Sequence, residues 1–120
     1  MSDLLGLFQY APDAETRPAG TVIFTAGEPG TVMYVVRRGE VTISVGDETV
    51  ETVGVGGLIG EMALLDDEPR SATARAATAC ELVPVDRKRF LFLVQQTPFF
   101  ALQVMRTMAT RLRGMNARVA

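Results

Sequence analysis

The sequence predicts a mainly β domain with added α, an antiparallel jelly-roll barrel followed by C-terminal helices. Two observations favour this fold class. Up to about residue 85, short apolar runs alternate with glycine-containing turns, and beyond it the hydrophobic period changes from two to about 3.6 residues. Strands this short and closely spaced favour a barrel over a parallel sheet. With 120 residues, 48% of them hydrophobic, the chain is expected to form a single domain over residues 1–120.

Turn residues bound each of the expected strands. Gly27 and Gly30 lie in the turn after the first strand, and Gly46-Asp47 is a two-residue hairpin signal between two alternating segments. The stretch 54–57, with three glycines, interrupts regular structure before the next motif. The predicted strands cover residues 21–24, 32–36, 40–45, 49–53, 71–77 and 80–85, and residues 61–65 can form one or two turns of helix.

Two helices are expected after the last strand. Asp86 suits the N-cap of a helix over residues 87–96, and Thr97-Pro98 suits the N-cap and first position of the next helix. On that second helix five apolar residues recur at spacings of three and four and form one stripe. They are Leu102, Met105, Met108, Leu112 and Met115.

Composition excludes several kinds of site. The chain has no histidine, which removes histidine-based acid–base catalysis and most transition-metal sites. Cys80 is the single cysteine and is expected in the core, so neither an internal disulfide nor a cysteine cluster can form. The first fifteen residues do not resemble a signal peptide, and no apolar run approaches the ~20 residues of a membrane span. The cytoplasm is the expected compartment.

Charge is unevenly distributed along the chain. The net charge is -2, yet seven basic and no acidic residues follow residue 86. These residues have two interpretations, a solvated helical face or a docking surface for an acidic partner. The seven are Arg87, Lys88, Arg89, Arg106, Arg111, Arg113 and Arg118.

The segment "GEMALLDDEPRSATA", residues 60–74, carries the candidate chemistry. Arg70 offers a fork of donors that matches a phosphate, and Ser71 adds a hydroxyl beside it. Glu61 can only accept hydrogen bonds, so it suits the hydroxyls of a sugar. The alternative is an internal ion pair of Arg70 with Glu61 or with an acid of residues 66–68, with no guest bound.

The longer segment "GLIGEMALLDDEPRSATARA" resembles the phosphate-binding cassette of cyclic nucleotide-binding domains, in which Gly-Glu-x-Ala-Leu is followed by Pro-Arg-(Ala/Ser/Thr)-Ala-Thr. The flanking segments "GTVIFTAGEPGTVMYVVRRGEVTI" and "CELVPVDRKRFLFLVQQTPF" are similar to the opening strands and to the last strand and first C-terminal helix of that family. The resemblance covers the chain from about residue 17 to 116.

The resemblance implies a role for each cassette residue. Arg70 would hold the exocyclic phosphate oxygens, with help from the hydroxyl and N–H of Ser71. Glu61 and the carbonyl of Gly60 would take the ribose 2′-hydroxyl, and the N–H of Ala63 would complete the phosphate cradle.

The positions that contact the base differ from those of the bacterial transcription factors of the family. Met115 and Asn116 stand where the family places a Thr-Ser pair, so Asn116 is the candidate base contact. Those transcription factors also continue into a helix-turn-helix that this sequence does not contain, so no direct DNA binding is expected.

The expected function is that of a small stand-alone regulatory module, not an enzyme. Its ligand would be cAMP, possibly cGMP, and it would act in trans on an unknown protein partner, without a membrane contact. One alternative is an interaction module that retains the fold and binds no nucleotide. A metal-dependent β-barrel enzyme is disfavoured, because the chain lacks the histidine ligands of such sites.

Overall fold

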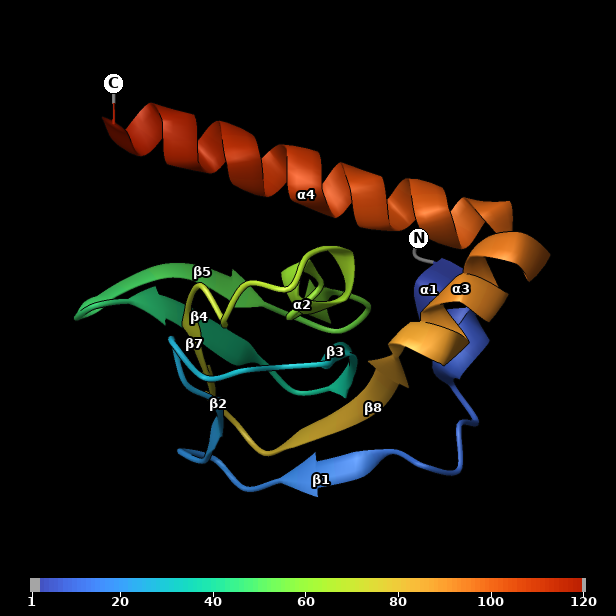
Figure 1. The fold of residues 1–120 in the computed structure, drawn as a ribbon. Coiled ribbons are helices and arrows are strands. Elements are labelled where there is room, and N and C mark those ends of the chain that lie inside the picture. Colours follow the sequence, from blue (N-terminus) through green and yellow to red (C-terminus); the bar gives the residue numbers. More distant parts are fainter. Residues whose placement is uncertain (1–2, 120) are drawn as a thin grey trace.

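The computed structural model describes the backbone of residues 3–119 and the side chains of residues 6–115. Within residues 3–119 eight strands and four helices follow one another, and the helices gather on one side of the strands (Figure 1). In chain order the elements are α1 (Asp3–Phe8), β1 (Glu15–Arg17), β2 (Val22–Phe24), β3 (Val32–Arg38), β4 (Val41–Val45), β5 (Glu48–Val53), β6 (Leu58–Ile59), α2 (Met62–Leu65), β7 (Thr73–Ala76), β8 (Cys80–Asp86), α3 (Arg87–Gln96) and α4 (Pro98–Val119).

The strands form two four-stranded sheets in which every neighbouring pair is antiparallel. Their strand orders are β1-β8-β3-β6 and β2-β7-β4-β5. The longest pairing joins β3 to β8, from Val32 opposite Asp86 to Arg38 opposite Glu81. Within residues 3–119 no strand pairing links the two sheets, so the barrel is open. The predicted mainly β fold with C-terminal helices is confirmed.

Two apolar clusters form the core. One lies between the two sheets, and the other lies between the β3–β8 face and the helices. In the second cluster the Phe100 ring of α4 meets Phe8 and Phe90 edge to face, with centroid separations of 6.2 and 5.7 Å. One aromatic group therefore joins α1, α3 and α4.

Local sequence signals explain most element boundaries. The Asp86 carboxylate accepts a hydrogen bond from the Arg89 N–H at 2.8 Å and caps α3, as predicted. Gly46 has φ +61°, which suits the two-residue turn between β4 and β5. At the next junction the Thr97 carbonyl, not its side chain, accepts from the Phe100 N–H at 2.8 Å.

Three short elements lie outside the predicted set, namely α1, β1 and β6. The side chain of Arg37 fixes the end of α1 and the turn after it, because one of its nitrogens donates to the carbonyls of Phe8, Gln9 and Ala11. An ion pair with Glu81 at 3.0 Å holds the same guanidinium on β8. This helix is thus placed by distant contacts, from Arg37 on β3 and from Phe100 on α4, that its own sequence does not reveal.

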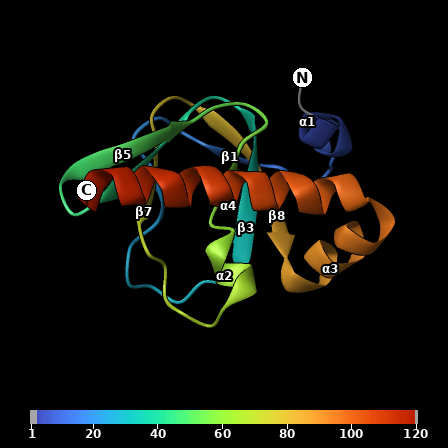
Figure 2. The ribbon, with the colours of Figure 1, turned by 90° about the horizontal axis from the view of Figure 1, so that it is seen from above.

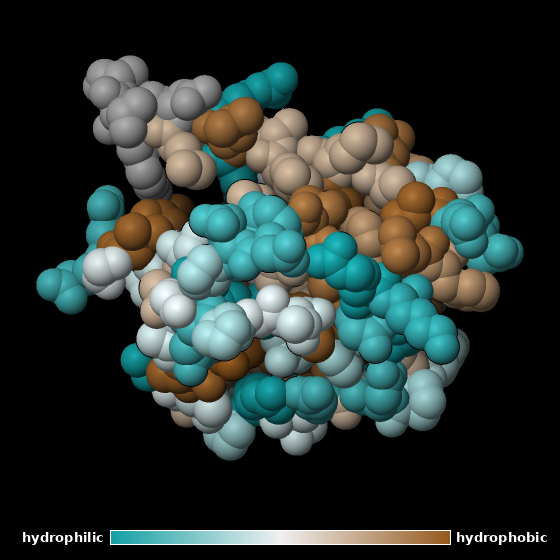
Figure 3. Space-filling view, viewed as in Figure 1, coloured by the Kyte–Doolittle hydropathy of each residue, from teal (hydrophilic) through white to brown (hydrophobic). Residues whose placement is uncertain are grey.

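The apolar stripe of α4 largely faces outward. The helix crosses above α2 and β5 (Figures 1 and 2) and buries Phe100 and Val104. Of the predicted stripe only Met108 packs against the core, and Met115 at its far end is 63% exposed. Apolar side chains accordingly gather along this helix at the top of the molecule (Figure 3).

Candidate functional site

The cassette begins at a sharp turn between β6 and α2. Gly60 has φ +76°, a conformation that side chains rarely adopt. A Cβ at this position would also lie 2.6 Å from a terminal nitrogen of Arg70 and 3.2 Å from the Phe24 ring. The Gly60 carbonyl accepts a hydrogen bond from the Ala63 N–H at 3.2 Å. This turn therefore brings the start of α2 directly against Arg70.

The backbone of Arg70 is tied to the turn between β2 and β3. Its N–H donates to the Glu28 carbonyl and its carbonyl accepts from the Gly27 N–H, both at 2.8 Å. Gly27 has φ +91°, which that turn requires. Two bonds over more than forty residues of sequence fix where the arginine side chain begins.

The guanidinium of Arg70 is packed between glycines and an aromatic ring. Its carbon lies 4.1 Å from the centroid of Phe24, and Nη2 donates to the Val32 carbonyl at 2.8 Å. Nη1 approaches the Gly60 carbonyl at 3.4 Å. A Cβ on Gly30 would lie 2.1 Å from Nε, so only glycine leaves room for this side chain.

Arg70 forms no ion pair with any acid among the described residues. No carboxylate among residues 6–115 forms an ion pair or hydrogen bond with its guanidinium, and its buried Nε has no acceptor. Burial lowers the pKa of this arginine from its ordinary value, although the group stays charged at neutral pH. The internal ion pair weighed from the sequence is absent here, and a partly buried cation is left with an unused donor.

Glu61 is buried and paired. It is 4% exposed and accepts from Nη1 of Arg111, which reaches down from α4. The same guanidinium donates to the Glu51 carboxylate at 2.8 and 3.2 Å and to the Leu58 carbonyl. Burial alone would lower the pKa of Arg111, but the hydrogen bonds to Glu51 and the charge of Glu61 raise it above its ordinary value.

Of the other predicted site residues, Ser71 follows Arg70 directly and Ala63 lies two residues after Glu61. Ser71 is exposed, precedes β7 and makes no hydrogen bond with another described residue. Ala63 is buried on α2, with its N–H already engaged by Gly60. The side chain of Asn116 lies outside the described residues, so the predicted base contact stays a prediction.

Arg111 and Glu51 are site residues that the sequence interpretation missed. Arg111 was assigned to an outward basic face, and this is wrong, because its side chain points inward and is 21% exposed. One signal was available in the sequence: Arg111 follows Phe100 and Val104 at helical spacing, on the buried face of α4. A cation on an apolar face implies a buried acid opposite it.

A cavity of about 240 Å³ lies beneath α4, lined by Glu51, Val53, Gly57, Leu58, Arg106, Thr107, Thr110 and Arg111. No cluster of metal-ligating side chains occurs among the described residues. Nor does any described helix combine the length and apolar character needed to cross a bilayer.

Comparison with known proteins agrees with this geometry. The sequence model of the cyclic nucleotide-binding domain matches residues 14–97. The chain belongs to the cyclic nucleotide-binding domain family. The candidate site residues Glu61 and Arg70 lie inside the matched segment, whereas Arg111 lies beyond it on α4.

Several of the similar proteins are longer than this chain. A cyclic nucleotide-gated potassium channel of Mesorhizobium japonicum is 42% identical over 101 residues, which cover 84% of this chain and 28% of the channel. The cyclic AMP receptor protein of Thermus thermophilus is 37% identical over 101 residues, covering 80% and 47%. The crystal structure of the Thermus thermophilus catabolite activator protein superposes with a TM-score of 0.80 at 31% identity, covering 99% of this chain and 58% of that one. The chain thus spans 28% to 58% of the length of these proteins.

Proposed function

We propose that this domain binds a cyclic nucleotide, with cAMP as its preferred ligand, and that binding regulates a partner protein. The observation that carries the proposal is the state of Arg70, a partly buried guanidinium without a carboxylate partner and with an unsatisfied Nε. A phosphate anion would supply the missing acceptor and the missing negative charge together. Membership of the family gives this interpretation its ligand class.

Each cassette residue has a role in the proposed complex. Arg70 and the free hydroxyl of Ser71 take the phosphate, and the Ala63 N–H completes the cradle by exchanging its bond to the Gly60 carbonyl for one to the ligand. Glu61 and the Gly60 carbonyl accept the ribose 2′-hydroxyl. Asn116 contacts the base. The preference for cAMP is supported by the similarity to a cyclic AMP receptor protein.

The proposed readout is the position of α4. The ion pair between Arg111 and Glu61 holds the far half of this helix on the domain. A bound ribose competes with Arg111 for the Glu61 carboxylate. Ligand binding then changes the contacts of α4, and the partner senses the change. The domain carries no catalytic role in this proposal and acts as a single regulatory unit over residues 1–120.

Calorimetric titration of the wild-type chain with cAMP and cGMP tests the proposal. Replacing Arg70 by Ala should cost roughly 2–5 kcal/mol of binding free energy, because a desolvated phosphate would lose its counter-charge. Arg70→Lys should restore only part of the loss, since an ammonium group lacks the planar fork. Equal affinity of wild type and Arg70→Ala for cAMP would show that the phosphate assignment is wrong, and tighter binding of cGMP would overturn the base preference.

A second candidate function is an interaction module that binds no nucleotide. The observation in its favour is the occupied state of Glu61, whose carboxylate already has a strong partner in Arg111. A ligand must then displace or share a buried ion pair. No heat and no thermal stabilisation with saturating cAMP or cGMP would favour this candidate over the first.

A further inference from the structure

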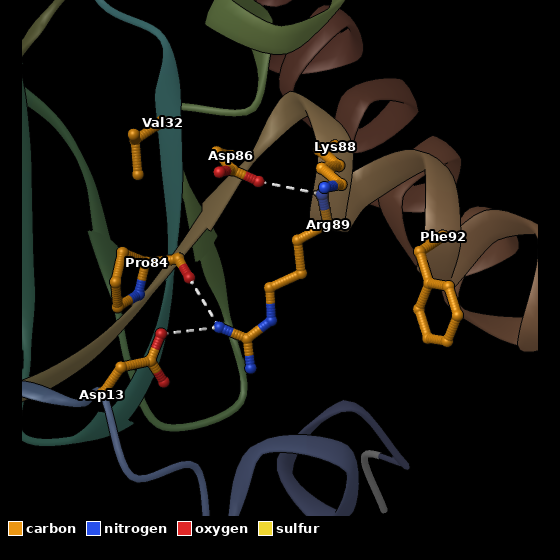
Figure 4. Close-up of a pocket in the computed structure, with 7 residues that line it drawn as sticks. All are labelled: Asp13, Val32, Pro84, Asp86, Lys88, Arg89 and Phe92. Carbon is orange, nitrogen blue, oxygen red and sulfur yellow. Dashed lines mark hydrogen bonds and ion pairs between the residues drawn. The ribbon is translucent and has the colours of Figure 1, made fainter.

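A second hollow lies away from the cassette, between the start of α3 and the segment before β1. Its volume is about 520 Å³, and its lining residues are Asp13, Val32, Pro84, Asp86, Lys88, Arg89 and Phe92. Figure 4 shows Arg89 reaching across it from α3 toward Asp13, with Pro84 on one side and Phe92 on the other. Phe92 is 60% exposed, so an apolar ring stands uncovered at the rim.

The charged side chains around the hollow differ in whether they have an ion-pair partner. Arg89 pairs with Asp13 at 2.8 Å, and its backbone N–H binds the Asp86 carboxylate, so both acids of the lining are engaged. Lys88 has no ion-pair partner among the described residues. Among the acids that the structure describes, Arg87 pairs only with Asp67, at 3.8 Å, and that carboxylate is fully exposed.

Helix stability does not account for these cations. Residues 87–89 are all basic and occupy the first turn of α3, where the helix dipole favours acidic side chains. Their position beside an open hollow and an exposed aromatic ring instead suits an occupant that brings its own negative charge. A flat lipid surface would leave the hollow unfilled.

Val32 connects the hollow to the cassette. It lines the hollow, and its carbonyl accepts the 2.8 Å hydrogen bond from Nη2 of Arg70. Val32 also pairs in register with Asp86, the N-cap of α3. A change in the position of Arg70 therefore alters the hydrogen bonding of a residue that forms the wall of the hollow.

We propose that this hollow is a docking site for a segment of a partner protein that carries a large apolar side chain flanked by acidic residues. The apolar side chain fills the space beside Pro84 and Phe92, and a carboxylate pairs with Lys88. Docking does not require a bound nucleotide. The coupling through Val32 rests on the proposed function, because it needs a ligand that engages Arg70.

The test uses amide chemical shifts of the isotope-labelled chain, titrated with blocked peptides that have a central Glu-Phe-Glu, Lys-Phe-Lys or Glu-Ala-Glu. The Glu-Phe-Glu peptide is expected to shift the amides of Val32, Lys88 and Phe92 saturably and to bind about five-fold or more tightly than the other two. Absence of saturable shifts, equal binding of the three peptides, or shifts mapping to another face would overturn the proposal.

Lys88→Glu gives the matched variant, and an acid in the first turn of α3 should not harm folding. It should weaken the Glu-Phe-Glu peptide about five-fold, whereas the same reversal at the exposed Arg113 of α4 should have no effect. Equal losses for both variants would indicate only a general charge effect and would sink the proposed site. So would stronger binding of the wild type to phosphatidylglycerol vesicles than to any peptide.

Coupling is measured by repeating the titration with saturating cAMP. The affinity for the peptide should change by about five-fold or more if Val32 transmits the state of Arg70. An unchanged affinity with cAMP bound would refute the coupling alone. A failure of cAMP to bind in calorimetry would refute the proposed function and leave the docking result, obtained without nucleotide, in place.

Discussion

Replacing Arg111 by Met tests whether the ion pair between α4 and the cassette stabilises the folded domain. Methionine keeps the length and apolar stem of the arginine and removes its charge and donors. The variant leaves Glu61, at 4% exposure, without the cation that now neutralises it. It also removes the bonds to Glu51, but this carboxylate reaches water and can be solvated.

The expected loss in the free energy of unfolding follows from the burial of Glu61 and the partial exposure of Glu51. Removing one partner of a buried pair costs roughly 3–5 kcal/mol, and the partial exposure of Arg111 places the expected value near the lower end, about 3 kcal/mol. The bonds to the more exposed Glu51 add less than about 1 kcal/mol. Once Glu61→Gln has removed the buried charge, Arg111→Met should cost only about 1 kcal/mol, so the two sites are coupled by about 2 kcal/mol.

Urea unfolding followed by far-ultraviolet circular dichroism measures all four free energies of this cycle. Arg113→Met is the control, since it removes the same charge from an exposed position two residues away and should change stability by less than about 0.5 kcal/mol. If Arg111→Met costs the same with Glu61 as with Gln, within about 0.5 kcal/mol, the pair carries no coupling and the reasoning fails.

Three further outcomes are expected. Gly30→Ala should displace the guanidinium of Arg70, because the new Cβ would fall 2.1 Å from Nε, and it should weaken cAMP binding about ten-fold while the unfolding free energy stays nearly constant. Unchanged calorimetric affinity would contradict that assignment. Glu61→Gln should lose roughly 1–2 kcal/mol of binding to cAMP but little to its 2′-deoxy analogue, and equal losses for both ligands would rule out the ribose role. Backbone amides of residues 108–119 should exchange faster with saturating cAMP, because the ribose competes with the Arg111 anchor of α4 for Glu61, and identical protection in both states would exclude α4 as the moving element.

Periodic segments were predictable from the sequence because local rules decide them. Alternation and glycine turns locate β2 to β5 to within a residue or two, and the Asp86 cap fixes where α3 begins. Elements decided by distant contacts were not predictable. α1 depends on the hydrogen bonds of Arg37, and β6 is only two residues long, Leu58–Ile59. Nothing in their own sequences distinguishes either from a loop.

The candidate site was predictable to the same extent. The spacing of Glu61 and Arg70 suggested a joint anion and sugar site, and in the structure the Arg70 guanidinium approaches the Gly60 carbonyl, next to Glu61 in the chain, while the Glu61 side chain pairs with Arg111. Which acid would pair with which arginine could not be read from the chain. The partner of Glu61 is Arg111, fifty residues away, and that choice depends on how α4 crosses the domain.

The aromatic contacts of Phe100 form a pivot near the start of α4, about which the rest of the helix can tilt. Two edge-to-face contacts hold the helix at Phe100, near its first turn, whereas Arg111 holds it eleven residues further on. At 1.5 Å per residue the distance between these supports is about 16 Å. A tilt of about 10° around Phe100 would therefore move Arg111 by about 3 Å, enough to break every hydrogen bond it makes, and would displace residue 119 by about 5 Å. A disturbance at the sugar site no larger than one hydrogen bond is thus magnified along the helix, and its largest displacement falls at the end farthest from the aromatic pivot.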